Sequence, residues 1–258
     1  MTKPIIDNGN SFDWGNTSEN YAKYRDIYPE RFFEELHRLG FGLEGERCLD
    51  IGTGTGVLPR FMHKYGSRLF GIDISRNQIK KAMELSSGMG IEYMVGSAER
   101  IPYGDSYFNA VSAAQCFAYF DMPRAIHEIA RVLKPNGVFV IAFLQWLPWE
   151  SEITQRSLNL VKSFNPDWDG YYERITANDI PAKLDCFRRK EYLEFDSELP
   201  FTYESWNGRM IACRGIEPSL SPAEVARFSR EHLEMLKSIT RDNFTLKHQT
   251  AIFCYEKE

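Results

Sequence analysis

The residues best suited to chemistry form a glycine-rich turn that follows a short apolar run. Residues 50–56 read DIGTGTG, so Asp50 precedes three glycines, Gly52, Gly54 and Gly56. Glycines allow a tight turn and a close backbone approach to a ligand, because they carry no Cβ atom. A helix that follows such a turn directs its free N–H groups at the same place. The pattern predicts a nucleotide-type binding site.

Asp50 indicates which kind of nucleotide this site accepts. A carboxylate would repel a pyrophosphate at the helix N-terminus, whereas an ammonium group or ribose hydroxyls would accept it. The glycine spacing is one residue shorter than the G-x-G-x-x-G of dinucleotide sites, and no Lys-Ser/Thr pair follows as in a P-loop. Asp73 ends the next apolar run, about 20 residues further on, where a carboxylate can hold ribose hydroxyls.

Alternating strands and helices must position this turn. Strands are expected near residues 47–51, 68–73, 92–95, 108–114 and 137–144, and helices near residues 57–65, 75–86 and 123–133. This alternation predicts a parallel sheet covered on both faces. In the last third of the chain, strands are expected near residues 188–195 and 247–255, with helices near 206–213 and 222–238.

Further segments follow the glycine turn in a recognisable order. They are residues 71–75 (GIDIS), 96–103 (GSAERIPY), 108–114 (FNAVSAA) and 128–137 (EIARVLKPNG). Together with residues 50–56, they resemble the class I S-adenosylmethionine (SAM)-dependent methyltransferases, in the manner of small-molecule enzymes related to the quinone-pathway C-methyltransferases. The resemblance is close over residues 45–145 and thinner outside them.

The resemblance implies an α/β fold with a Rossmann-like, doubly wound, seven-stranded and mostly parallel sheet. An antiparallel edge strand and a C-terminal lid insertion, helical and aromatic, complete this fold. Residues 1–40 would form a helical cap over the donor site, residues 41–145 the SAM-binding core, and residues 146–258 the remaining strands with the lid, all in one structural domain. Aromatic residues of the expected lid region are Trp146, Trp149, Trp168, Tyr171 and Tyr172.

The resemblance also implies positions for the methyl donor. Asp50 and the glycines would hold its methionine end, Asp73 its ribose, and the segment around Ala98 its adenine. Ser97 stands where the family usually has an Asp that contacts the adenine amino group. The predicted SAM-binding residues are Asp50, Gly52, Thr53, Gly54, Gly56, Asp73, Ile74, Ser97, Ala98, Glu99 and Gln115.

Other residues are candidates for positioning the substrate. Residues 21–29 (YAKYRDIYP) resemble a family segment that folds over the donor site, and on a helix Tyr21 and Tyr24 or Arg25 share one face. The alternative is that these tyrosines only pack the helix onto the sheet. Gln115 follows the fourth strand and Trp146 the fifth, at the edge where parallel sheets bind ligands. No residue is assigned a catalytic role.

The composition agrees with a small-molecule enzyme. The 258-residue chain has a formal net charge of -5, which argues against a nucleic-acid polymer as its main partner. No apolar run is long enough to span a membrane, and the N-terminus lacks a secretory apolar region. The five cysteines form no C-x-x-C pair, which is typical of reduced thiols and indicates no zinc site. We therefore expect a cytoplasmic protein that binds no metal.

The predicted function is that of a SAM-dependent methyltransferase (EC 2.1.1.-) that transfers a methyl group to an oxygen, nitrogen or carbon atom of a small molecule. SAM is the expected cofactor and S-adenosylhomocysteine the product, and a homodimer is an open alternative to a monomer. Three other functions stay open: a non-catalytic SAM-binding partner subunit, a tRNA methyltransferase, and an NAD-dependent oxidoreductase, which Asp50 disfavours. Binding of SAM but not of NAD would exclude the last of these.

Overall fold

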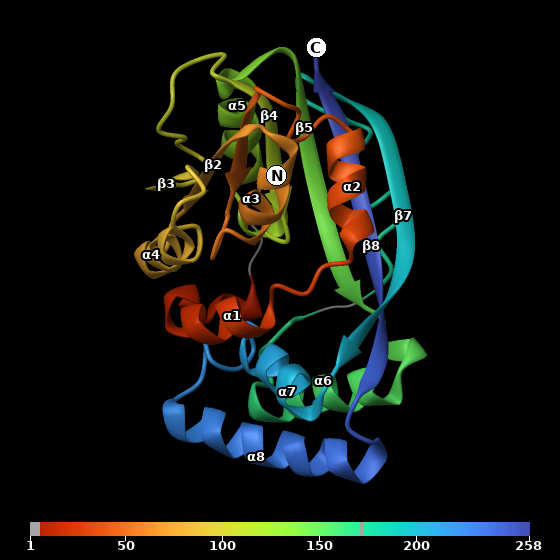
Figure 1. Ribbon diagram of the computed structural model, residues 1–258. Coiled ribbons are helices and arrows are strands. Elements are labelled where there is room, and N and C mark those ends of the chain that lie inside the picture. Colours follow the sequence, from red (N-terminus) through yellow and green to blue (C-terminus); the bar gives the residue numbers. More distant parts are fainter. Residues whose placement is uncertain (1–5, 171–172) are drawn as a thin grey trace.

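The computed structural model describes residues 6–170 and 173–258, so that residues 1–5, Tyr171 and Tyr172 lie outside the described residues. Within the described residues, an eight-stranded sheet with the order β3-β2-β1-β4-β5-β8-β7-β6 forms the centre of the molecule (Figure 1). Its strands are β1 (Arg47–Ile51), β2 (Arg68–Asp73), β3 (Glu92–Val95), β4 (Phe108–Ala114), β5 (Leu133–Trp146), β6 (Lys183–Leu184), β7 (Phe187–Phe201) and β8 (Phe244–Lys257).

Five neighbouring strands, from β3 to β5 in the sheet order, run parallel to one another. The strand order reverses between β1, which pairs with β2, and β4, which pairs with β1 on its other side. Such a switch point leaves a crevice at the carboxyl ends of the strands, because the connections leave in opposite directions. Asp50 lies in β1 and the glycine turn follows it, so the fold places the predicted site at this crevice.

The other end of the sheet is antiparallel. β8 pairs with β5 over nine residues, from Val138↔Glu256 to Trp146↔His248, and β7 pairs with β8 on its outer side. The fold class predicted from the sequence is confirmed, and the sheet has one strand more than the seven expected. The extra strand, β6, is a two-residue segment that pairs with the start of β7, too short for any alternation of apolar residues to predict it.

Helices cover both faces of the sheet. They are α1 (Ser18–Tyr24), α2 (Glu30–Arg38), α3 (Val57–Met62), α4 (Arg76–Leu85), α5 (Met122–Val132), α6 (Glu152–Phe164), α7 (Tyr203–Ile211) and α8 (Pro222–Ile239). Phe33 of α2 and Met62 of α3 are buried on one face, and Ile126 and Ile129 of α5 on the other. In Figure 1 α1 lies between the parallel strands and the helices α6, α7 and α8. No helix of the described ranges is both long and apolar enough to cross a membrane.

A three-helix layer, made of α6, α7 and α8, lies beyond α1 (Figure 1). It has its own apolar core, in which Leu158, Trp206, Met210 and Phe228 are buried. The sequence predicted α7 and α8, whereas α6 was missed because the periodicity after Trp146 is weak. The N-terminus of α6 still has a local sequence signal, because the Ser151 hydroxyl accepts the Thr154 N–H and caps the helix.

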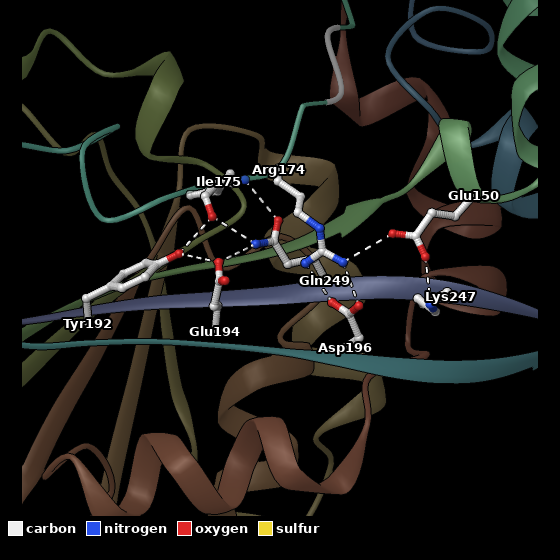
Figure 2. A network of polar contacts seen from close by, with 8 residues as sticks. All are labelled: Glu150, Arg174, Ile175, Tyr192, Glu194, Asp196, Lys247 and Gln249. Atoms are coloured by element: carbon white, nitrogen blue, oxygen red, sulfur yellow. Dashed lines mark hydrogen bonds and ion pairs between the residues drawn. The ribbon is translucent and has the colours of Figure 1, made fainter.

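The segment between α6 and β6 is fixed to the outer strands by polar contacts (Figure 2). Arg174 donates two hydrogen bonds to Asp196 of β7, at 2.9 and 2.6 Å, and one to Glu150. The main chain of Ile175 exchanges two hydrogen bonds with the side-chain amide of Gln249 on β8. These contacts hold an irregular segment against one face of the β7–β8 pair without an apolar core of its own.

Buried polar groups join the helices of the three-helix layer to one another. The Ser157 hydroxyl oxygen of α6 accepts from Trp206 Nε1 at 2.9 Å, and it lies 2.9 Å from His232 Nε2 and 2.7 Å from the Ile153 carbonyl oxygen. The other ring nitrogen of His232, Nδ1, lies 2.9 Å from Asn207 Oδ1, which can only accept, so the proton of the neutral ring is on Nδ1. Burial lowers the pKa of His232 to about 3, because a charged imidazolium would lose its hydration there.

Acidification should therefore destabilise the protein through His232. The unfolded imidazole gains a proton below its ordinary pKa of 6.5, whereas the buried ring stays neutral, so stability is lost as the pH falls. For His232→Gln we expect the slope of unfolding free energy between pH 6 and pH 5 to fall by about 1.4 kcal/mol per pH unit. Urea denaturation at several pH values measures this slope. The exposed His63→Gln is the control, and equal slopes in both variants would contradict the prediction.

Candidate active site

The three glycines of the turn all adopt positive φ angles, 64° at Gly52, 56° at Gly54 and 76° at Gly56. A Cβ atom at Gly52 would lie 2.8 Å from the Cys116 side chain, and one at Gly56 would lie 2.3 Å from Tyr93 Oη. Glycine is therefore required at both positions for backbone conformation and for packing. A Cβ at Gly54 would meet only the Tyr21 ring, at 3.6 Å, so the turn faces Tyr21 at that residue.

Asp50 is the most strongly perturbed acid of the site. Its side chain is 3% exposed and accepts a hydrogen bond of 2.8 Å from the Ser112 hydroxyl of β4. Burial raises the pKa of Asp50 to about 7, the Ser112 hydrogen bond opposes this shift, and the charge of Asp73 adds to it. No cation of the described residues is ion-paired with Asp50. The site thus contains a desolvated carboxylate that would be stabilised by a cationic ligand.

Asp73 ends β2 and fixes the glycine turn. One carboxylate oxygen accepts the N–H of Gly54 at 3.0 Å, and the other accepts the N–H of Ser75 at 2.8 Å. Burial raises the pKa of Asp73, and these two backbone N–H groups oppose the shift. The sequence predicts a ribose contact for this acid. The structure shows a bridge between the turn and the start of α4, and the ribose contact stays a prediction.

A narrow pocket opens above Asp50. Its empty space is about 350 Å³, part of it open to solvent. The floor comes from the ends of β1 and β4 and from the glycine turn, and the roof comes from the N-terminal helices. The residues that line the pocket include Tyr21, Tyr28, Asp50, Gly52 and Thr53.

Residues 6–17, which we call the N-terminal strap, reach across this region. The Trp14 carbonyl accepts a hydrogen bond of 2.9 Å from the Gln78 side chain of α4, and the Asp13 N–H donates to the Pro218 carbonyl at 3.0 Å. The strap therefore joins the helix that follows Asp73 to the segment between α7 and α8. No local pattern predicts this role, because the strap has no periodic arrangement of apolar residues.

Tyr21 and Arg25 share the face of α1 that is turned to the glycine turn. The Arg25 guanidinium lies 4.4 Å from the centre of the Tyr21 ring and donates to the Ala212 carbonyl at 3.2 Å. Tyr24 does not share this face: its ring packs on Gly208 of α7, where a Cβ would lie 2.2 Å away. The Tyr24 side chain contacts α7, where its hydroxyl donates to Glu204, so its role in substrate positioning stays a prediction without a contact to the glycine turn.

The predicted adenine segment is held by capping contacts. Ala98 is 4% exposed and packs in the core, and Ser97 forms an isolated bridge with Arg100. Glu99 accepts the N–H of Asp121 at 2.9 Å, so this acid ties the segment to the start of α5. Ile74, by contrast, leaves 73% of its surface exposed directly after Asp73, where a flat apolar ligand would find a contact.

Gln115 and Cys116 follow β4 at the crevice. Gln115 has a φ of 63°, and its side-chain amide donates to the Leu144 carbonyl at 2.7 Å. β4 ends at Ala114, so its backbone does not reach the Leu144 carbonyl of β5. The Gln115 side chain supplies the hydrogen bond to that carbonyl instead. The Cys116 thiol donates to the Ile51 carbonyl at 3.0 Å, and burial raises its pKa well above the usual value. This thiol is unsuited to act as a nucleophile.

Trp146 ends β5 and lies under the three-helix layer. Its ring packs against Trp206 at 5.7 Å between centres and against the Arg209 guanidinium at 5.4 Å. Arg209 is only 3% exposed, although the sequence favours a surface charge at this position of a helix. Sequence periodicity could not find it, because α7 is buried on nearly all sides between α1 and α8.

One further charged cluster was missed by the sequence. Arg214 Nε lies 2.8 Å from Asp7 Oδ2, and the same guanidinium donates to Tyr119 at 3.1 Å and pairs with Asp169. These partners come from the strap, from the segment after β4 and from the segment after α6. The cluster therefore connects three parts of the chain that surround the candidate site, none of which is close to another in sequence.

Comparisons with known proteins agree with this geometry. Residues 49–141 match a family model described as a methyltransferase domain. The "Uncharacterized methyltransferase YcgJ" of Bacillus subtilis is 30% identical over 240 residues, which cover 89% of this chain and 88% of that protein. The "Ubiquinone biosynthesis O-methyltransferase" of Alkalilimnicola ehrlichii is 28% identical over 204 residues, covering 76% and 79%.

Solved structures agree in fold. The crystal structure of the YcgJ protein from Bacillus subtilis has a TM-score of 0.55 and 19% identity to this chain, covering 87% of this chain and 97% of that one. The chain therefore belongs to the class I SAM-dependent methyltransferases and is a methyltransferase enzyme. The predictions of family, fold class and enzymatic activity are confirmed.

Asp50 should make the ligand-free protein less stable as the pH rises. Its folded pKa of about 7 lies above the ordinary value of 3.8, so the folded state holds the proton longer, and stability is lost between these two pH values. The free energy of unfolding of Asp50→Asn, relative to that of the wild type, should rise by up to about 4 kcal/mol between pH 4 and pH 8. Urea denaturation of both proteins at these pH values measures the difference. A constant difference would show that Asp50 is not desolvated.

Proposed function

We propose that this methyltransferase binds SAM at the glycine turn, transfers its methyl group to a small-molecule acceptor and releases S-adenosylhomocysteine without a metal. Asp50 would hold the ammonium group at the methionine end, and Asp73, with Ile74 beside it, would hold the ribose and the adenine side. The observation that carries the proposal is the desolvated Asp50 carboxylate at the floor of a pocket. A ligand with an ammonium group removes the unfavourable burial of that charge.

The donor supplies an electrophilic methyl group, so the chain has to align an acceptor and exclude water. Tyr21 and Tyr28 roof the pocket over Asp50 and Gly52, and this roof limits access of solvent. Arg25 contributes a positive charge beside the Tyr21 ring. The ionisable groups that act on it are Tyr21, Tyr28, Tyr119 and Cys213, and no carboxylate of residues 6–170 and 173–258 is ion-paired with it.

The donor site is tested by calorimetric titration with SAM, S-adenosylhomocysteine and NAD. We expect micromolar binding of the first two and none of NAD, because the site offers a carboxylate where a pyrophosphate would lie. Asp50→Asn should weaken binding of S-adenosylhomocysteine by about 1.5–3 kcal/mol, roughly 10–150-fold. The same variant should be more stable without ligand. Unchanged affinity would remove Asp50 from the donor site.

Asp50→Asn is a cleaner test than a change at Asp73. Replacing Asp73 by Ala would also remove the acceptor of the Gly54 and Ser75 N–H groups, so that lower affinity could reflect a displaced turn. Donor binding without release of S-adenosylhomocysteine from any acceptor would favour a non-catalytic SAM-binding subunit instead.

Arg25 and Tyr24 provide a matched pair of variants on α1. Arg25→Met should lower turnover about tenfold or more, equivalent to at least about 1.4 kcal/mol of transition-state stabilisation, because it removes a cation beside the pocket. Tyr24→Phe should leave turnover unchanged, since it removes only a hydrogen bond to Glu204 of α7. Product release and melting temperature are measured for both. If Arg25→Met lowers only the melting temperature, Arg25 has a packing role.

A further inference from the structure

Two buried polar side chains of β8 each have one atom without a hydrogen-bond partner within the described residues. His248 and Thr250 are two residues apart on the strand and so lie on the same face of the sheet. His248 is 1% exposed and Thr250 is 0% exposed. Within residues 6–170 and 173–258, His248 Nε2 and Thr250 Oγ1 have no hydrogen-bond partner. Buried polar atoms of this kind are rare in folded proteins, and an absent ligand is one physical reason for them.

The tautomer of His248 follows from its single hydrogen bond. Its Nδ1 lies 2.9 Å from the Leu246 carbonyl, which can only accept, so Nδ1 carries the proton and Nε2 carries a lone pair. Burial, together with the positive charge of Arg209, lowers the pKa of His248 to about 4 against the opposing hydrogen bond with Leu246, so the ring is neutral at physiological pH. His248 therefore offers an acceptor to an O–H or N–H group of a ligand.

Arg209 offers the opposite chemistry close by. This buried residue of α7 stacks its guanidinium on Trp146, and Trp146 is the residue directly opposite His248 in the β5–β8 ladder. A guanidinium donates hydrogen bonds in a fixed planar fork that matches a carboxylate. The neutral acceptor on β8 and the cation on α7 thus define two different contacts for one molecule.

Tyr28 links the surroundings of these groups to the pocket over Asp50. Tyr28 lines that pocket together with Asp50 and Gly52, and it also packs against the core of the three-helix layer. Burial raises the pKa of Tyr28, and the ionisable groups that act on its hydroxyl include Tyr21, Arg25, Arg209 and Asp50. A molecule held at His248 and Arg209 would therefore lie next to the donor pocket.

We propose that His248, Thr250 and Arg209 form the acceptor subsite and that the methyl acceptor is a hydroxylated carboxylic acid. This inference rests on the proposed function, since it needs a methyl donor in the neighbouring pocket. The acceptor's hydroxyl group donates to His248 Nε2, its carboxylate accepts from Arg209, and its apolar part packs on Trp146. Thr250, whose hydroxyl both donates and accepts, completes the polar contacts.

The experiment measures preference ratios on protein saturated with S-adenosylhomocysteine. The probes are 4-hydroxybenzoate, 3-(4-hydroxyphenyl)propionate and salicylate, each compared by calorimetry with its analogue without the hydroxyl group and with phenol. We expect at least one hydroxy acid to bind about tenfold or more tightly than both of its comparison compounds. A compound that lacks the hydroxyl group or the carboxylate leaves the matching protein group without a hydrogen bond.

Variants then assign each contact. His248→Phe should abolish the preference for the hydroxyl group, His248→Gln should restore part of it through its side-chain oxygen, and Arg209→Met should abolish the preference for the carboxylate. Affinity for S-adenosylhomocysteine should stay within about twofold in all three variants, because these side chains do not line the donor pocket. Binding of a probe should also shift the NMR signal of His248 Nε2.

Two results would overturn the subsite. In the first, no hydroxy acid binds better than its comparison compounds, and the orphaned groups are then satisfied by water alone. In the second, the ratios survive His248→Phe and Arg209→Met, so the probes bind elsewhere. Retained affinity for S-adenosylhomocysteine in either case would leave the proposed donor site standing, whereas its absence in the wild type would contradict the donor site itself.

Discussion

The arrangement of the site depends on the burial of the Asp50 carboxylate. Asp50 ends up buried because β1 lies in the middle of a parallel sheet, between β2 and β4. The turn after it has to pass close to Cys116 and Tyr93, which only glycines allow. Asp73 then fixes the turn from the next strand. A cationic ligand reverses the unfavourable burial, so binding and folding are coupled at this residue.

A second constraint comes from the length of the outer strands. β5 continues four residues past the level at which β4 ends, and β7 and β8 pair over their full lengths beyond it. This extension supports the three-helix layer, and Gln115 satisfies a carbonyl that the extension exposes. The layer and the sheet meet around Trp146 and His248. Polar groups in that contact are out of water and therefore act strongly on any ligand placed there.

How far the sequence predicted the site depends on whether the signal was local. The glycine spacing, the acid before it and the acid at the end of β2 are local patterns, and the structure brings them together at the switch point. Tyr24 and Gln115 were candidates by position, but their side chains satisfy α7 and β5 instead. Arg209 is a charged helix residue that is nevertheless buried. Each of these depends on an element distant in the chain, which no local pattern encodes.

The sequence alone determined the alternation of strands and helices, the turn that only glycines can form, and the family to which the chain belongs. The first two follow from apolar periodicity and backbone sterics, which act over a few residues, and the family follows from the resemblance of short local motifs. Tertiary structure alone decided which polar side chains became buried and which charges met. Desolvation and pairing depend on contacts between residues as distant as Asp7 and Arg214, or Trp146 and His248, and those contacts exist only once the chain has folded.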